Sequence, residues 1–167
     1  VSPYGTHKMV TEHMARSYAR QYGVNIALVR LFSVYGPGLR KQLLWDACGK
    51  LSRGDRLFHG IGLETRDWLH VSDAARLLLE AGRRASSSCP TVNGGTGAAT
   101  TVRDTLAIVA GGLGIAGPVE FSGVSRAGDP TAYQADTAIL SSWSWQPEVS
   151  LEKGLNEYVE WFRAGAP

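Results

Sequence analysis

Tyr4 and Lys8 are the residues near the start of this chain whose types and spacing could perform acid–base chemistry. Apolar residues recur at helical spacing over residues 4–22, with Ser2-Pro3 as a start signal and Gly23 as a stop signal. Residues four apart lie on one face of a helix, so the two side chains can converge on one ligand. A free tyrosine has a pKa of about 10, and an adjacent ammonium stabilises the phenolate by roughly a few kcal/mol. The pair predicts a tyrosine acid/base, with a core tyrosine beside a solvated lysine as the alternative.

The elements that must position this pair alternate between strands and helices, which predicts an α/β fold. An apolar, β-rich run at residues 25–31 is typical of a buried parallel strand, and residues 32–38 follow as strand end and turn. We expect Ser72 or Asp73 to cap the helix at 73–84. The other predicted strands lie at about 56–59, 66–71, 91–93 and 118–121, and the other helices at about 41–51, 100–110, 137–143 and 151–164.

Seven segments, in order along essentially the whole chain, resemble the extended short-chain dehydrogenase/reductase family, which includes NAD-dependent nucleotide-sugar epimerases and dehydratases. Each motif is weak alone, and their order makes the resemblance specific. The segments are SPYGTHK (2–8), RLFSVYGPG (30–38), TRDWLHVSD (65–73), VNGGTG (92–97), RAGDP (126–130), WQP (145–147) and LEKGL (151–155).

This resemblance implies the C-terminal half of a Rossmann-type fold, doubly wound and mostly parallel, with a small α/β substrate-binding lobe. Residues 1–35 and about 88–97 would form sheet elements and the catalytic helix, and about 36–87 and 98–167 mainly the lobe. We expect the N-terminal dinucleotide-binding half to lie outside these residues. Gly111, Gly114 and Gly117 have the spacing of its phosphate loop, but they follow a predicted helix and not a strand. We therefore expect little turnover from these residues alone.

The resemblance also implies roles for the residues that match its motifs. Tyr4 would move the proton of a sugar hydroxyl, Lys8 would tune Tyr4 and hold the nicotinamide ribose, and the backbone of Phe32 would line the nicotinamide pocket. Arg66 would bind the substrate diphosphate, because a guanidinium forms paired bonds to phosphate. Ser33 would be a further substrate position, at which the family commonly has asparagine. Leu57 and Phe58 would contact the nucleobase. Arg126 and Asp129 would belong to a loop that closes over the nucleotide.

Each substrate position has a structural alternative. Arg66 could instead be a surface arginine paired with Asp67 or Asp73, and residues 57–58 could be a core strand. Residues 126–129 could be an ordinary polar turn.

The function implied is an NAD(P)-dependent nucleotide-sugar epimerase that transiently oxidises a sugar hydroxyl. NAD is the expected cofactor and NADP its alternative, and a nucleotide-diphosphate sugar is the expected partner. A 4,6-dehydratase or a keto-sugar reductase of the same family are the enzymatic alternatives. A non-catalytic fragment or nucleotide-sugar-binding module is the alternative from another class. Family members are often dimers through the catalytic helix, and the apolar positions of residues 9–22 are compatible with a homodimer.

The composition bears on whether the protein binds nucleic acid or metal, spans a membrane or depends on disulfides. A net charge of +2 does not favour a nucleic-acid partner, and no apolar run approaches a membrane span. Cys48 and Cys89 have neither metal-ligand spacing nor the pattern of a disulfide framework, which indicates a reducing cytoplasm. The four histidines show no paired spacing, so we expect no metal.

Overall fold

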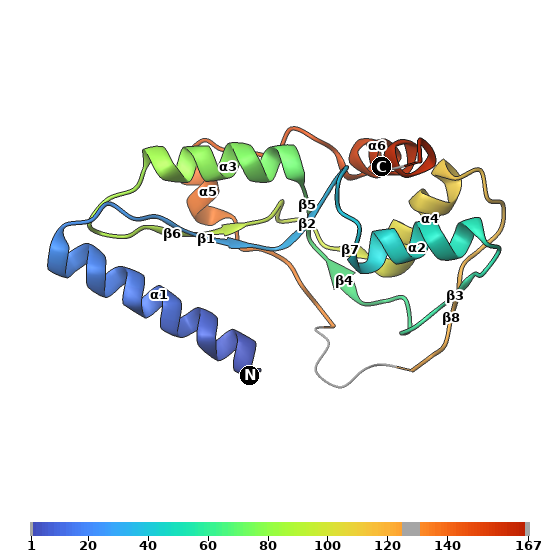
Figure 1. The fold of residues 1–167 in the computed structure, drawn as a ribbon, viewed down its shortest axis with the longest axis horizontal. Coiled ribbons are helices and arrows are strands. Elements are labelled where there is room, and N and C mark those ends of the chain that lie inside the picture. Colours follow the sequence, from blue (N-terminus) through green and yellow to red (C-terminus); the bar gives the residue numbers. More distant parts are fainter. Residues whose placement is uncertain (1, 125–130, 166–167) are drawn as a thin grey trace.

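The computed structural model describes residues 2–124 and 131–165 as an α/β structure (Figure 1). Helices α1 and α3 lie along opposite sides of a short parallel strand pair, and α2, α4 and α6 form a second lobe. The helices are α1 (Pro3–Tyr22), α2 (Gln42–Ser52), α3 (Val71–Arg83), α4 (Val102–Gly112), α5 (Ala138–Ser142) and α6 (Leu151–Arg163). The strands are β1 (Leu28–Leu31), β2 (Ser33–Tyr35), β3 (Leu57–Phe58), β4 (Thr65–Arg66), β5 (Trp68–His70), β6 (Thr91–Gly94), β7 (Thr100–Thr101) and β8 (Glu120–Phe121).

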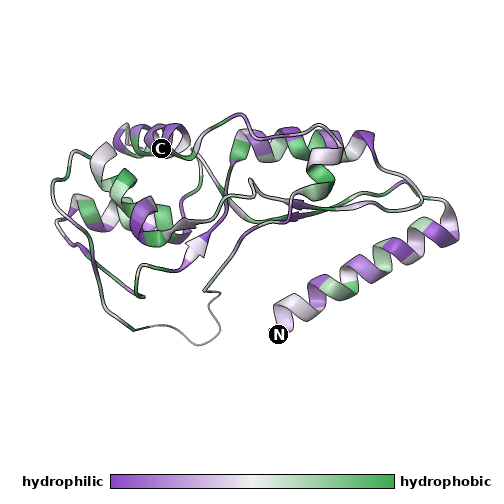
Figure 2. Cartoon of the chain, turned by 180° about the vertical axis from the view of Figure 1, so that it is seen from behind, coloured by the Kyte–Doolittle hydropathy of each residue, from purple (hydrophilic) through white to green (hydrophobic). Residues whose placement is uncertain are grey.

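Helix α1 begins and ends where the sequence predicts. The Ser2 hydroxyl accepts a hydrogen bond from the Gly5 N–H at 3.1 Å, and Pro3 occupies the first helical position, where no N–H is needed. Gly23 ends the helix at φ 66°, a left-handed conformation that glycine adopts without steric cost. Only Ala19 is fully buried on this helix. Hydrophobic and hydrophilic residues alternate along α1 (Figure 2). Large side chains more than half exposed on this helix include Met9, Val10, Met14, Tyr18 and Tyr22.

The strand after α1 changes its pairing partner at Phe32. Strand β1 pairs in parallel with β6, and β2 pairs in parallel with β5. Between them, the Phe32 N–H donates to the Gly94 carbonyl and the Ser33 N–H donates to the Asp67 carbonyl, both at 3.0 Å. Residues 33–35, predicted only as strand end and turn, therefore form a second strand that connects the sheet region to the lobe.

The start of α3 differs from the prediction of a Ser72 or Asp73 cap. The helix begins at Val71, and His70 is the cap, with its Nδ1 accepting from the Ser72 N–H at 3.4 Å. Asp73 is buried, and its carboxylate accepts hydrogen bonds from the backbone N–H groups of Glu148 and Val149. The helix-capping rule considers only neighbouring residues and assigned Asp73 to the helix end. The prediction failed because the Asp73 carboxylate instead binds the distant segment at residues 148–149.

Two apolar cores hold the fold together. The first joins α2, α4 and α6 and contains Leu44, Leu106 and Tyr158. The second lies between α3, α5 and the β1–β6 pair and contains Leu77, Val92 and Leu140. Helices α3 and α5 thus pack on the sheet side, although their residues fall in ranges that the sequence assigns mainly to the lobe.

Most other predicted elements are found within two residues of their expected bounds. Two differ. The strand predicted at 25–31 is a continuous strand only at 28–31, with an isolated bridge from Ile26 to Ser86, and the segment at 66–71 divides into β4 and β5 before α3 begins. Within the described residues, no helix is long and apolar enough to cross a membrane.

Candidate active site

The predicted catalytic pair lies on the first turns of α1. The Lys8 Nζ is 5.4 Å from the centroid of the Tyr4 ring, so both side chains project from one face of the helix. Tyr4 is 71% exposed. Among the described residues, neither the Tyr4 hydroxyl nor the Lys8 ammonium has a hydrogen-bond partner. Both polar ends are therefore available to an external ligand.

Phe32 and Ser33 lie at the point where the strand changes partner. The Phe32 N–H is bonded to Gly94, and its carbonyl accepts from the Val34 N–H at 2.9 Å, which leaves one carbonyl lone pair for a ligand. Ser33 is half-buried at the start of β2. This geometry fixes the backbone at the position where the sequence predicts contact with cofactor and substrate.

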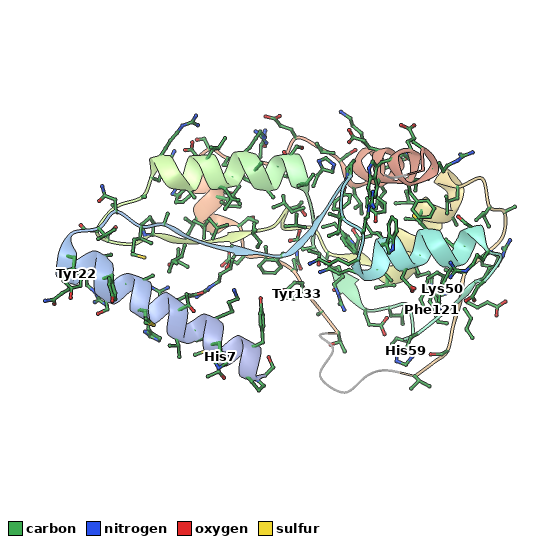
Figure 3. All side chains as sticks on the ribbon, viewed as in Figure 1. His7, Tyr22, Lys50, His59, Phe121 and Tyr133 are labelled. Carbon is green, nitrogen blue, oxygen red and sulfur yellow. The ribbon has the colours of Figure 1, made fainter. Side chains whose placement is uncertain are left out.

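Tyr133 packs beside the predicted site, a contact that the sequence analysis did not predict. The centroid of its ring lies 4.6 Å from the centroid of the Phe32 ring, and the two ring planes are inclined at 34°. The Tyr133 N–H donates to the Thr65 hydroxyl at 3.2 Å, next to Arg66. Figure 3 shows Tyr133 between the start of α1, marked by His7, and the lobe that carries His59. No local motif indicates such a ring pair, because Phe32 and Tyr133 are far apart in sequence.

Arg66 extends this neighbourhood. It is half-buried on β4, which pairs antiparallel with β7, and its Nη1 donates to the Thr65 carbonyl at 2.8 Å. The carboxylates of Asp67 and Asp73, which the sequence offered as alternative partners, are bonded to other segments. Contacts among the described residues thus bring Phe32, Ser33 and Arg66 together. Tyr4 and Lys8 make no described hydrogen bond or ring contact with that group.

The other predicted substrate residues are placed differently. Leu57 is 51% exposed on β3, whereas the neighbouring Phe58 is 3% exposed and packs in the lobe core. Burial favours the structural alternative for the Phe58 side chain and leaves Leu57 as the apolar surface that a nucleobase could contact. Arg126 and Asp129 lie outside the described residues.

Asp67 holds the neighbourhood of Arg66 in place, a role that the sequence analysis did not assign. The residue is fully buried. Its Oδ1 accepts from the Thr96 N–H and hydroxyl, both at 2.7 Å, and its Oδ2 accepts from the N–H groups of Gly97 at 2.9 Å and Ala135 at 3.0 Å. A buried carboxylate with four donors is well compensated for desolvation. The sequence signal that could have indicated this role is the position of Asp67, a charged residue directly before the buried strand β5.

The described residues contain no group of three or more histidine, cysteine or acidic side chains that could hold a metal ion. Cys48 and Cys89 are buried free thiols. A cleft of about 410 Å³ lies between Trp68, Thr100 and residues 147–151, and it contains none of the predicted site residues.

A comparison with protein-family models identifies the family of this chain. Residues 1–93, more than half of the chain, match the model of the NAD dependent epimerase/dehydratase family. The chain belongs to the NAD dependent epimerase/dehydratase family.

Relatives and solved structures agree with this assignment. A putative UDP-glucose 4-epimerase of Methanocaldococcus jannaschii is 29% identical over 168 residues, covering 98% of this chain and 54% of the relative. The UDP-glucose 4-epimerase of Thermotoga maritima, solved with UDP-glucose, superposes with a TM-score of 0.88 at 29% identity, covering 100% of this chain and 55% of that one. MoeE5, solved with UDP-glucuronic acid and NAD, superposes with a TM-score of 0.86 at 29% identity, covering 98% and 56%. dTDP-glucose 4,6-dehydratases are also among the relatives.

The family match confirms the resemblance, and the superposition on these structures confirms the predicted Rossmann-type α/β fold class. The chain spans about half the length of the curated relatives it matches.

Proposed function

We propose that the protein carrying this chain is an NAD-dependent nucleotide-sugar epimerase, and that this chain supplies its acid/base pair and its substrate lobe. The observation that carries the proposal is the Tyr4–Lys8 pair, whose polar ends have no hydrogen-bond partner among the described residues. The relatives that act on UDP-glucose support the substrate class.

The donor set fits the nicotinamide ribose of the cofactor. A phenol hydroxyl and an ammonium on one helix face can both bond ribose hydroxyls. The carbonyl of Phe32, the residue before Ser33, retains one lone pair that can accept a further hydrogen bond. When bound, NAD accepts a hydride from a sugar carbon and returns it. NADP remains the alternative cofactor.

The residues of this chain then have separate tasks. Tyr4 removes the proton of the sugar hydroxyl and later returns it, and Lys8 stabilises the phenolate charge of Tyr4. Arg66 binds the diphosphate of the substrate through its guanidinium, and Leu57 contacts the nucleobase. Ser33 contributes a hydroxyl at the substrate side of the strand switch. Arg126 and Asp129 are proposed to close over the nucleotide.

Epimerisation returns the hydride with inverted stereochemistry, so it needs no second acid/base to expel water. The nucleotide-sugar 4,6-dehydratases among the relatives make dehydration the second candidate. Product analysis separates the two, because a dehydratase releases water and gives a keto-sugar, whereas an epimerase gives an isomer of its substrate.

Thermal denaturation with ligands tests the proposal, using the protein as its gene encodes it. The ligands are NAD and the UDP-, dTDP-, GDP- and CDP-forms of glucose, each added separately. A ligand at about 100 times its Kd adds about 2.7 kcal/mol to the free energy of unfolding, which raises Tm by several degrees. A shift with NAD and with one nucleotide sugar supports the proposal and names the base. A shift with a nucleotide sugar and no turnover would favour a binding module, and no shift with any ligand would contradict both.

We also propose that the protein forms a homodimer in which α1 lies at the interface. We propose the cytoplasm as its location. Met9, Val10 and Met14 are each more than half exposed, and a large exposed apolar face marks an interaction surface. Met14→Glu should convert a dimer to a monomer in light scattering, whereas Leu79→Glu on α3, 65% exposed, should not. A monomeric wild-type protein would contradict this assembly.

A further inference from the structure

Helix α1 is attached to the rest of the described chain through few side chains. Ala19, in its last turns, is its only fully buried residue. Every side-chain hydrogen bond between α1 and another described element involves Glu12 or Arg16. The position of the first turns, which carry Tyr4 and Lys8, therefore depends on these two residues more than on apolar packing.

The contacts of Glu12 form a paired-fork ion bridge to strand β1. The Arg30 Nε lies 2.6 Å from the Glu12 Oε1, and the Arg30 Nη2 lies 2.7 Å from the Glu12 Oε2. The Arg16 Nη2 adds a bond of 3.1 Å to the same Oε2 and a bond of 3.0 Å to the Thr91 hydroxyl on β6. Two parallel bonds fix orientation as well as distance, because carboxylate and guanidinium are both planar.

This bridge is more enclosed than an ordinary surface ion pair. The Glu12 side chain is 17% exposed, although that of Arg30 is 53% exposed. The hydrogen bonds from Arg30, helped by that from Arg16, lower the pKa of the Glu12 carboxyl to about 2, against the opposing effect of burial. Glu12 is therefore charged at every pH at which an enzyme of this class would be assayed.

The bridge joins the two parts of the proposed catalytic centre. Glu12 follows Lys8 by one helical turn on the same face, and Arg30 precedes Phe32 on the strand that switches partner at that residue. A helix is stiff over this length, since Tyr4 lies only about 12 Å from Glu12 along the axis. Fixing Glu12 thus fixes the position and rotation of Tyr4 and Lys8.

We propose that Glu12 and Arg30 are positioning residues, whose paired bonds set Tyr4 and Lys8 against the Phe32–Ser33 backbone. This inference rests on the proposed function for its catalytic consequence. It adds a residue pair that touches neither substrate nor cofactor and acts through the orientation of α1.

A double-mutant cycle tests this role in the protein as its gene encodes it. Glu12→Gln and Arg30→Gln should each lower kcat by about 10- to 100-fold, because a displacement of about 1 Å can cost 100-fold. The KM for the nucleotide sugar should change less than twofold, because the lobe that binds it is untouched. The double variant should lose no more than either single variant, since each already breaks the same link.

Glu80→Gln is the matched control. Glu80 also bonds two arginines, Arg83 and Arg84, and its side chain is 22% exposed, but all three residues belong to or cap α3. This variant should keep kcat within twofold. Wild-type kcat in Glu12→Gln, or losses that multiply in the double variant, would overturn the proposal.

Hydrogen exchange supplies a readout that does not depend on turnover. Amides in residues 4–12 should exchange at least about 10-fold faster in Glu12→Gln than in the wild type and in Glu80→Gln, because the attachment is lost. Unchanged exchange would overturn the positioning role even in an active enzyme. Faster exchange in a protein that converts no nucleotide sugar would instead leave the attachment established and refute the proposed function, together with the catalytic role of the bridge.

Discussion

The carboxylate of Asp67 accepts a hydrogen bond from the backbone N–H of Ala135, which lies 68 residues further along the chain. The same carboxylate bonds Thr96 and Gly97. One buried charge thus connects three segments next to Arg66: the start of β5, the turn after β6 and the segment that carries Tyr133.

Asp67→Asn should destabilise the fold strongly. The amide keeps one acceptor oxygen, but its NH2 group faces backbone donors, so at least one buried N–H is left unpaired. We expect a loss of about 3 kcal/mol in the free energy of unfolding, or about 6–12 °C in Tm for a chain of this size. Urea denaturation measures the loss.

Asp46→Asn on α2 is the control for that change. Asp46 is exposed, and a surface substitution of this kind changes stability by no more than about 0.5 kcal/mol. Equal stability of the two variants would show that the four bonds to Asp67 contribute little.

Tyr4→Phe should remove turnover and cost NAD binding no more than one hydrogen bond, because Lys8 and the Phe32 carbonyl remain in place. The ring and its contact with Lys8 remain, and only the hydroxyl that transfers the proton is lost. General acid–base groups contribute about 100- to 10,000-fold in rate, so kcat should fall by that factor. Tyr22→Phe at the other end of α1 is the control, because Tyr22 is 69% exposed against 71% for Tyr4. A Tyr4→Phe variant with near-normal kcat would remove Tyr4 from the mechanism.

Arg66→Lys tests the diphosphate contact. Lysine keeps the positive charge and loses the planar fork, so one paired contact to phosphate becomes a single one. The KM for the nucleotide sugar should rise about tenfold with little change in kcat. Arg53→Lys, at the exposed end of α2, should leave both constants unchanged. An unaltered KM in Arg66→Lys would assign Arg66 to structure alone.

The ion bridge at Glu12 predicts a pH dependence of stability. Its folded-state pKa of about 2 lies below the ordinary value of 4.5, mainly because Arg30 donates hydrogen bonds to the carboxylate. A depressed carboxyl pKa stabilises the folded state above about pH 4.5, and this contribution is lost as the pH falls towards 2. The wild type should therefore exceed Glu12→Gln by about 1–3 kcal/mol at pH 7, after screening by solvent, and by almost nothing at pH 2. A difference that does not vary with pH would contradict this assignment.

Local rules predicted the elements whose ends are fixed by their own residues. Ser2 and Gly23 bound α1 in the sequence and in the structure, and the Tyr4–Lys8 geometry follows from helical spacing alone. Thr101 likewise caps α4 through the Asp104 N–H, close to the predicted start.

Features that depend on distant partners were not predictable in this way. Strand β2 exists because residues 33–35 find β5, and the α3 cap moved to His70 because Asp73 is bonded to Glu148 and Val149. The Phe32–Tyr133 ring pair and the Glu12–Arg30 bridge are of the same kind. Sequence spacing predicted the Tyr4–Lys8 pair, whereas the contacts between distant segments around it became visible only in the tertiary structure.

The most direct test of the central claim is to follow a nucleotide sugar by proton NMR in D2O, with the protein as its gene encodes it and with NAD. The account predicts inversion at one hydroxyl-bearing carbon with the hydrogen on that carbon retained, because it moves as hydride and returns without exchange with solvent. Deuterium at the inverted carbon would contradict the account, since it would mean that a proton and not a hydride leaves that carbon. Failure to convert any of the UDP-, dTDP-, GDP- or CDP-sugars would contradict it as well.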